Sequence, residues 1–169
     1  MKPPLLVAGL TAGLVFGWAD QTTASHTGLL FGASARVHVT MTEYKFSPDR
    51  ITVEAGTPVD LVLENKGLVS HVFMVYPRPT SLPRGTGAWW DYVLANTYLR
   101  DMGEILVHSR GEFVVAGTRL SEVAVEPGKK VTLTFTPTRK GTFEIGCHLT
   151  GGGGGSHYTA GQKGTLVVR

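Results

Sequence analysis

The chain has 169 residues, a net charge of +3 and 17% charged residues, so its length suits one domain with a core of its own. Lysine and arginine are too few and too scattered for a nucleic-acid-binding face, on which they cluster. The sequence has no Gly-x-Gly-x-x-Gly or phosphate-loop motif. Its single cysteine, Cys147, excludes an internal disulfide.

The N-terminal segment predicts export. Lys2 precedes an apolar stretch, residues 5–18, and residues 22–24 end in a small residue suited to cleavage. The stretch is shorter than the roughly 20 apolar residues of a membrane span. We therefore predict a signal peptide at 1–24, a domain at 25–169, and a periplasmic or other extracytoplasmic location. An uncleaved membrane anchor is the alternative.

Short strands separated by turns dominate the chain after residue 35. Residues 36–44 alternate between apolar and polar side chains, which is the period-two pattern of a half-buried strand. Further strands, bounded by Gly, Pro, Asn or Asp turns, are expected at 50–54, 59–64, 70–76, 120–125, 130–136, 141–146 and 164–169. Strands at intervals of about ten residues predict an all-β fold, a Greek-key sandwich or barrel.

Residues 78–119 interrupt this rhythm and are interpreted as an insertion packed on one end of the sandwich. The proline-rich segment 77–83 should be irregular. Residues 104–115 predict a hairpin, and residues 87–102 predict a helix. The helix rests on apolar side chains at spacings of three and four, namely Trp90, Val93, Leu94, Thr97 and Tyr98. The Trp89–Trp90 pair is expected to cover the core, with a partner-binding surface as the alternative.

One set of side chains could bind a metal. Its members are His71, Cys147, His148 and His157, with Gln162 close behind. Two imidazoles and a thiolate with a weak axial ligand form the ligand set of copper electron-transfer sites. His71 lies just inside a predicted strand, Cys147 ends another, and His157 precedes the last. Strand ends can meet at one edge of an antiparallel sandwich, so these residues can lie together.

The same segments resemble the cupredoxins, or blue copper proteins. "YKFSPDRITVEAGTPVDLVLENKGLVSHVFMV" is similar to the first half of that family, in which Asn65 precedes the first ligand, His71. "VEPGKKVTLTFTPTRKGTFEIGCHLT" and "HYTAGQKGTLVV" are similar to the second half. The resemblance covers about residues 36–77 and 120–169. It implies one copper per chain, held by His71, Cys147 and His157, in a monomer that carries electrons between redox protein partners.

The axial position departs from most of the family. Most cupredoxins have methionine where this chain has Gln162, although stellacyanin-like members have glutamine. The resemblance therefore implies that Gln162 is the axial ligand. An amide oxygen is a harder donor than a thioether, so it should lower the reduction potential and could improve zinc binding. The alternative is that Gln162 is an ordinary loop residue.

The loop between Cys147 and His157 is unusually long because it contains five consecutive glycines. Without residues 152–156 the pattern would be Cys-x₄-His-x₄-Gln, and "GGGGS" is a flexible-linker composition. We interpret the loop as lengthened by design, the alternative being a natural glycine-rich loop. Added length costs little loop-closure entropy, so the fold should survive while His157 loosens. His148 then becomes a rival ligand, although strand alternation directs it away.

Other chemistry is not indicated, and we predict that the chain is not an enzyme. A binuclear copper-A centre needs two cysteines, and multicopper oxidases need His-x-His pairs that this sequence lacks. The second reading is a copper-binding or copper-delivery protein without redox cycling, against which the four scattered methionines argue. A third is a metal-free binding module that uses Trp89 and Trp90.

Overall fold

The computed structural model describes residues 34–81, 83–84, 87–100, 105–109, 112–117, 120–151 and 155–169, with only the backbone for 112–117. Contacts divide the chain into residues 1–30 and residues 31–169, and every described element belongs to the second unit. The predicted signal peptide lies outside the described residues. Among the described residues, no helix is long and apolar enough to cross a membrane.

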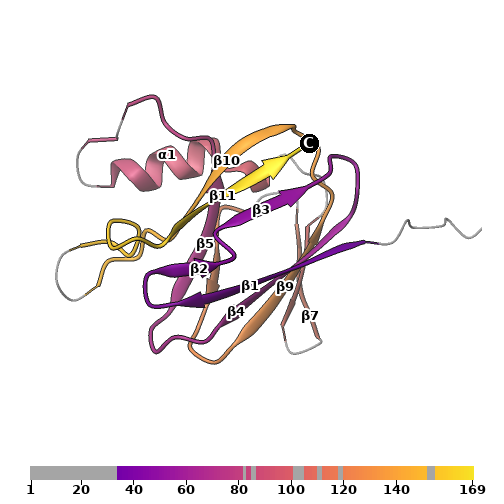
Figure 1. Ribbon diagram of the computed structural model, residues 1–169, viewed down its shortest axis with the longest axis horizontal. Helices are drawn as coiled ribbons and strands as arrows, with labels where there is room; N and C mark the ends of the chain where they lie inside the picture. The colour runs from indigo at the N-terminus through magenta and orange to yellow at the C-terminus, as the bar shows by residue number, and fades with distance from the viewer. Residues whose placement is uncertain are drawn as a thin grey trace, which may run out of the picture. The chain divides into compact units, whose positions relative to one another are not determined.

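Two sheets make up the described unit (Figure 1). One has the strand order β2-β1-β4-β9-β6-β7, and the other has the order β3-β11-β10-β5-β8. The predicted all-β sandwich is therefore confirmed. The strands are β1 (Ala35–Thr42), β2 (Lys45–Ser47), β3 (Arg50–Val53), β4 (Val59–Asn65), β5 (His71–Tyr76), β6 (Ile105–Ser109), β7 (Glu112–Gly117), β8 (Val123–Val125), β9 (Lys130–Phe135), β10 (Gly141–Gly146) and β11 (Lys163–Val168).

The core lies between the sheets and is built by the alternation that the sequence shows. In β1 the side chains of Val39 and Met41 are fully buried while their neighbours are only partly so. β5 differs, because all six of its residues are buried. It lies between β10 and β8 in its sheet and packs against the helix α1 (Ala88–Asn96) on one face. A strand covered on both faces reads as a continuous apolar run.

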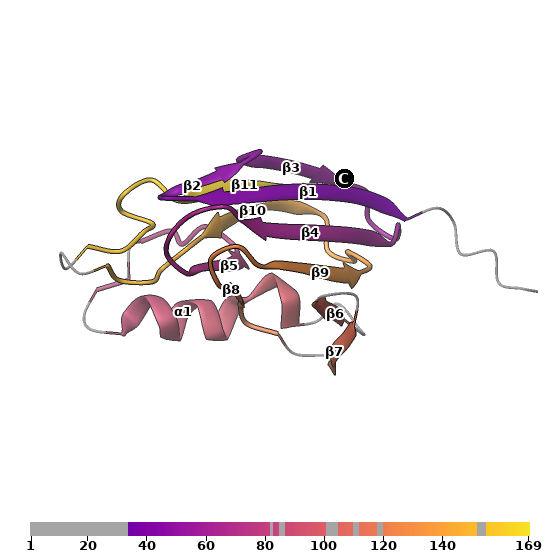
Figure 2. The same ribbon diagram turned by 90° about the horizontal axis from the view of Figure 1, so that it is seen from below.

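Sheet register brings the chemically interesting segments to one end of the sandwich. β10 runs antiparallel to β5 with Gly146 opposite Met74, so the residue after β10 lies near the start of β5. β10 also pairs with β11 through Gly146 and Lys163. The β1–β2 turn, the β4–β5 loop and the β10–β11 loop all lie at the left end of Figures 1 and 2. Cys147, His71 and His157 therefore come from neighbouring segments.

The insertion differs from the prediction in two ways. The β6–β7 hairpin does not cap one end of the sandwich; it extends a sheet, because β6 pairs with β9. The helix is shorter than predicted: α1 ends at Asn96, and a 3-10 turn follows at Tyr98–Arg100. Leu94, predicted on the buried face, is 46% exposed. Figure 2 shows α1 beside β5.

The first predicted strand is also interrupted. Residues 36–44 were expected to run straight, but the chain turns after Thr42 and folds back as β2, with Thr42 opposite Lys45. Tyr44 makes this turn with a φ of 62°. Tyrosine rarely adopts such a left-handed conformation, and a residue held in it marks a position that surrounding contacts determine.

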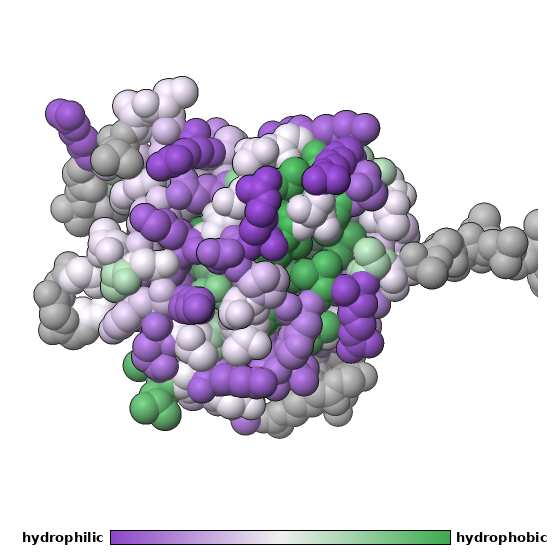
Figure 3. Space-filling view, in the orientation of Figure 1, coloured by the Kyte–Doolittle hydropathy of each residue, from purple (hydrophilic) through white to green (hydrophobic). Residues whose placement is uncertain are grey.

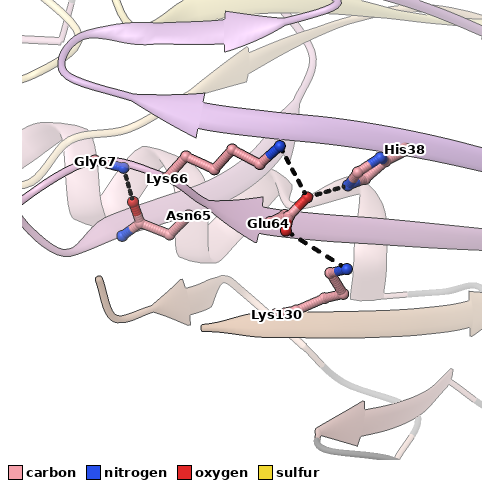
Figure 4. A network of polar contacts seen from close by, with 6 residues as sticks. All are labelled: His38, Glu64, Asn65, Lys66, Gly67 and Lys130. Atoms are coloured by element: carbon pink, nitrogen blue, oxygen red, sulfur yellow. Dashed lines mark hydrogen bonds and ion pairs between the residues drawn. The ribbon is translucent and has the colours of Figure 1, made fainter. Parts of the chain in front are cut away.

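An ion-pair network ties three strands together on the outside of the first sheet. Glu64 of β4 contacts His38 of β1 at 2.8 Å, Lys66 at 3.6 Å and Lys130 of β9 at 3.5 Å (Figure 4). These side chains are partly exposed, so each pair contributes little to stability. Glu64 directly precedes Asn65, so the network lies at the end of β4.

Candidate metal centre

Three buried side chains place their ligand atoms together. The nitrogen atoms of His71 and His157 and the sulfur of Cys147 all lie within 4.8 Å of one another. His157 Nδ1 is 3.4 Å from Cys147 Sγ, and the two imidazole rings meet edge to face with centroids 5.3 Å apart. The structure thus brings together three of the four predicted ligands from three different segments.

His71, at the start of β5, carries the clearest sign that something else should bind here. Its side chain is fully buried, yet neither ring nitrogen has a hydrogen-bond partner. Buried polar atoms almost always have partners, and an orphaned one points to a bound ion or water. Burial lowers the pKa of His71 below its usual value. A neutral imidazole is the form that binds metals.

Cys147 follows β10 and is also fully buried. Its backbone N–H donates to the carbonyl oxygen of Gln162 at 3.2 Å, and Val72 N–H donates to its sulfur at 3.3 Å. Burial raises the pKa of the thiol, although backbone N–H groups, that of Val72 first, act in the opposite direction. The backbone of Cys147 is therefore held by Gln162, and its sulfur by β5, the strand that carries His71.

The long loop is closed at its base, which anchors His157. His157 N–H donates to Leu149 O at 2.8 Å, and Thr150 and Ser156 form a β-bridge. Gly151 N–H then donates to Gly155 O at 3.0 Å. These bonds join the two ends of the loop, residues 149–151 and 155–157, while residues 152–154 of the glycine run lie outside the described residues. Whether the run was added by design remains a hypothesis.

Gln162, the predicted axial ligand, lies at the same site. It is fully buried, its Oε1 has no partner, and its Nε2 is 3.5 Å from Thr42 O, to which it donates. Burial is the larger effect and lowers the pKa of His71, whereas the nearby Gln162 side chain raises it. The two side chains therefore lie close together, although no hydrogen bond joins them. A buried amide oxygen without a donor fits a weak metal ligand.

The β1–β2 turn forms a wall of the site that sequence reasoning missed. Thr42 O accepts from Gln162, the Glu43 carboxylate accepts from Leu68 N–H just before His71, and the Tyr44 ring meets that of His157 edge to face at 5.0 Å. The turn residues thus contact two segments that lie far apart in the sequence, the β4–β5 loop and the β10–β11 loop. The local signal of this turn is the positive φ of Tyr44, and a backbone angle of this kind cannot be recognised in the sequence.

Asn65 holds the loop that leads into His71 (Figure 4). Its Nδ2 donates to Val69 O and to Val125 O, both at 2.8 Å, and its Oδ1 accepts from Gly67 N–H at 2.9 Å. The side chain therefore uses both amide atoms to join the β4–β5 loop to β8. This is a supporting role, since Asn65 lies one loop before the candidate ligand.

His148 lies outside the metal-binding group, as strand alternation predicts. Its Nε2 is 2.6 Å from the hydroxyl of Tyr76, and its ring stacks on those of Trp89 and Tyr158. Burial lowers the pKa of His148 to about 4, so it is neutral at pH 7. Trp89 and Trp90 both pack against the core, as the sequence analysis expects.

Apolar side chains are exposed beside the group. The exposed large hydrophobic residues of the described chain are Tyr44, Leu68, Val69 and Leu94. The first three flank the site, and Leu68 is 87% exposed. Figure 3 shows a hydrophobic protrusion where the β4–β5 loop lies in Figure 1. Exposed apolar groups gathered at one place favour an interaction surface.

Comparisons with known proteins agree with this arrangement. No protein-family model matches the chain. It is 30% identical to the copper-resistant cuproprotein CopI of Pseudomonas aeruginosa, over 98% of this chain and 97% of that protein. Auracyanin A, a "blue" copper protein of Chloroflexus aurantiacus, has a TM-score of 0.50 and 18% identity over 81% of this chain and 100% of its own. A multi-copper oxidase of Pediococcus acidilactici has a TM-score of 0.51 and 13% identity, with 31% of that protein covered.

The two solved structures show likeness of fold only, because their identity to this chain is low. The relative from Pseudomonas aeruginosa is similar over nearly its full length. Together with the two-sheet fold, that similarity establishes the family: the chain has a cupredoxin-like β-sandwich fold and belongs to the family of the copper-resistant cuproprotein CopI.

Proposed function

We propose that the chain binds one copper ion through His71, Cys147 and His157, with Gln162 as a weak axial ligand, and carries single electrons between redox partners. The observation that carries the proposal is the buried group of three ligand atoms within 4.8 Å, in which both His71 nitrogens lack partners. Two imidazoles, a thiolate and an amide oxygen fit copper better than a hard cation such as calcium or magnesium.

The surrounding residues suit an electron carrier. Copper bound here would supply a one-electron Cu(II)/Cu(I) couple. The protein holds the ligands through contacts that do not depend on the metal, including Val72 N–H on the sulfur and Leu149 O on His157 N–H. Ligands held in this way need to move little between oxidation states, because surrounding contacts orient them.

The exposed residues Tyr44, Leu68 and Val69 would form the docking surface for the redox partner. Small, apolar contacts suit a transient encounter, which buries little area.

Electron self-exchange between oxidised and reduced copies, measured by NMR line broadening, tests this docking surface, because both copies would use it. Leu68→Lys should slow it about tenfold through like-charge repulsion. Leu94→Lys on α1 is the matched control.

We also propose that the protein works outside the cytoplasm, as the N-terminal sequence suggests.

Titration of the metal-free protein with Cu(II) tests the metal site. We expect one equivalent to produce an intense thiolate-to-copper absorption band and a type 1-like paramagnetic resonance spectrum. Cys147→Ser should abolish the band, while His148→Gln should retain it. A weak, ordinary Cu(II) spectrum that Cys147→Ser leaves unchanged would contradict the proposal.

A second candidate function is copper binding or delivery without redox cycling. It is favoured by the relative, whose name describes copper resistance. The two functions differ in what reduction does to the bound metal. An electron carrier should pass through repeated cycles of ascorbate reduction and ferricyanide oxidation with its copper retained. A delivery protein should lose copper to a Cu(I) chelator within the first cycle.

A further inference from the structure

Three rings pack against one another in a cluster beside the ligand loop. The His148 imidazole stacks on the indole of Trp89 and on the phenol ring of Tyr158, each at a centroid distance of 4.7 Å with ring planes inclined by 22° and 23°. Trp89 also contacts Tyr158 directly, with centroids 5.5 Å apart, so each ring of the cluster touches the other two. Trp89 comes from α1, in the insertion between the two segments that resemble other cupredoxins, and the other two rings come from the loop.

The positions of the two loop rings relate the stack to the metal centre. His148 directly follows Cys147, and Tyr158 directly follows His157. Holding one ring against the other therefore fixes the distance between the two stretches of backbone that carry the candidate ligands. This contact between side chains adds to the backbone hydrogen bonds that join the same two stretches, such as His157 N–H to Leu149 O.

Contacts around the stack lock each ring in place. Tyr76 of β5 hydrogen-bonds to His148 Nε2 at 2.6 Å, and Tyr158 donates its hydroxyl proton to Glu144 of β10 at 2.5 Å. Lys163 lies 5.5 Å from the centre of the Tyr158 ring. A Cβ at Gly146 would collide with the Tyr76 hydroxyl and lie 3.0 Å from His148 Nε2. The absence of a side chain at Gly146 thus makes room for the stack.

Trp89 is held by a helix whose position does not depend on the ligand loop. α1 packs against β5, and Tyr92 of the same helix donates to Pro77 O at 2.7 Å, so the helix position is set independently of the loop. From that support Trp89 contacts both His148 and Tyr158. Trp90 packs against the core and is not part of the stack.

We propose that Trp89, His148 and Tyr158 form an aromatic clamp that holds the two ends of the ligand loop together, with Trp89 as a positioning residue for the metal centre. The clamp acts together with the hydrogen bonds at the base of the loop, which join the backbone of the same two stretches. It rests on the proposed function only for its effect on copper, since the clamp itself is present without a metal.

The test compares Trp89→Leu, which keeps an apolar group but removes the stacking face, with Trp90→Leu as the matched control. In the metal-free protein, the His157 amide proton should exchange with solvent at least tenfold faster in Trp89→Leu, measured by NMR. In Trp90→Leu it should exchange as in the wild type. With copper, Trp89→Leu should shift the thiolate-to-copper band and the reduction potential, and Trp89→Tyr should restore both.

Two further variants keep the test decisive. If Trp89→Leu does not fold, Tyr158→Leu removes another ring of the cluster and should produce the same faster exchange. Tyr158→Phe keeps the ring and should leave exchange close to the wild type. Unchanged His157 exchange in both Trp89→Leu and Tyr158→Leu would overturn the clamp. If the wild type binds no copper but the exchange results hold, the proposed function fails and the clamp stands.

Discussion

Gln162 Nε2 donates to the carbonyl oxygen of Thr42 at 3.5 Å, while the Oε1 atom of the same side chain is buried without a partner. The β1–β2 turn thereby orients the predicted axial ligand from a segment 120 residues away. An amide held by its nitrogen presents its oxygen to whatever occupies the site.

Replacing this amide by a thioether should raise the reduction potential. Gln162→Met offers copper a softer donor, which favours Cu(I) over Cu(II). A tenfold shift in the relative affinity of the two oxidation states is about 60 mV for a one-electron couple, and we expect at least that increase in a redox titration.

Gln162→Leu supplies no donor and should raise the potential further than Gln162→Met does. The order Gln, Met, Leu from low to high is the expected result. Equal potentials in all three proteins would show that residue 162 is an ordinary loop residue and not an axial ligand.

Asn65 should be important for the stability of the metal-free protein. Two of its three side-chain hydrogen bonds are buried and the third, to Val69 O, is part-buried. Asn65→Ala leaves Val69 O, Val125 O and Gly67 N–H without their partner. We expect the free energy of unfolding in urea to fall by about 2–3 kcal/mol. An unsatisfied buried group costs about 1–3 kcal/mol, and two of the three groups are buried.

The comparison with Asn65→Asp separates lost contacts from lost volume. An aspartate can accept from Gly67 N–H but faces two carbonyl oxygens, so it should be no more stable than the alanine variant. Lys66→Ala, which removes an exposed contact to Glu64, should change stability by less than about 0.5 kcal/mol. An Asn65→Asp protein as stable as the wild type would contradict the assigned hydrogen bonds.

Local patterns predicted most of the strands because burial in a sandwich follows the same period of two as the sequence. β1, β3, β4, β5 and β8 to β11 lie where alternation and turn residues predict them. β2 was missed because a tyrosine at φ 62° makes the turn before it, and tyrosine is not a turn signal. The β6–β7 hairpin was predicted as an element, but its pairing with β9 depends on contacts that no local pattern contains.

The candidate ligands could be recognised by residue type, spacing and resemblance, but their surroundings could not. His71, Cys147 and His157 are the kinds of side chain that bind copper, and the structure brings them together. Glu43 and Trp89 have no such chemical signature. Their contacts with the site exist only because the β1–β2 turn and α1 fold against it.

Glu122 should make stability depend on pH. Its Oε2 is buried without a partner, and burial raises the pKa of this carboxyl. An acid whose pKa is higher in the folded state contributes stability while it is protonated. That contribution is lost as the pH rises from its unfolded value of 4.5 through the raised folded value.

Glu122→Gln removes the charge and keeps the shape, so it should raise the Tm of the metal-free protein at pH 7. The gain should shrink as the pH falls toward 4.5 and the wild-type carboxyl becomes protonated. Glu126→Gln, which alters an exposed side chain on the same segment, is the control. A lower Tm at pH 7 in Glu122→Gln would mean that the carboxylate has a stabilising partner.

Gly164 should tolerate no side chain, because the backbone of another segment lies against it. It belongs to β11, and a Cβ there would lie 2.5 Å from Asp49 O, which also accepts from Thr165 N–H at 2.7 Å. A backbone oxygen held in this way cannot move aside as a flexible side chain can. Gly164→Ala must therefore displace the entry to β3, and overpacking of this kind typically costs about 1–3 kcal/mol.

Gly155→Ala provides the matched comparison. Its added Cβ would lie 3.5 Å from the Thr159 hydroxyl, an ordinary contact in the exposed ligand loop. Urea unfolding of the metal-free proteins should show a clear loss of stability for Gly164→Ala and a change within about 0.5 kcal/mol for Gly155→Ala. Equal stabilities would place β3 farther from β11 than their parallel pairing at Arg50 and Thr165 indicates.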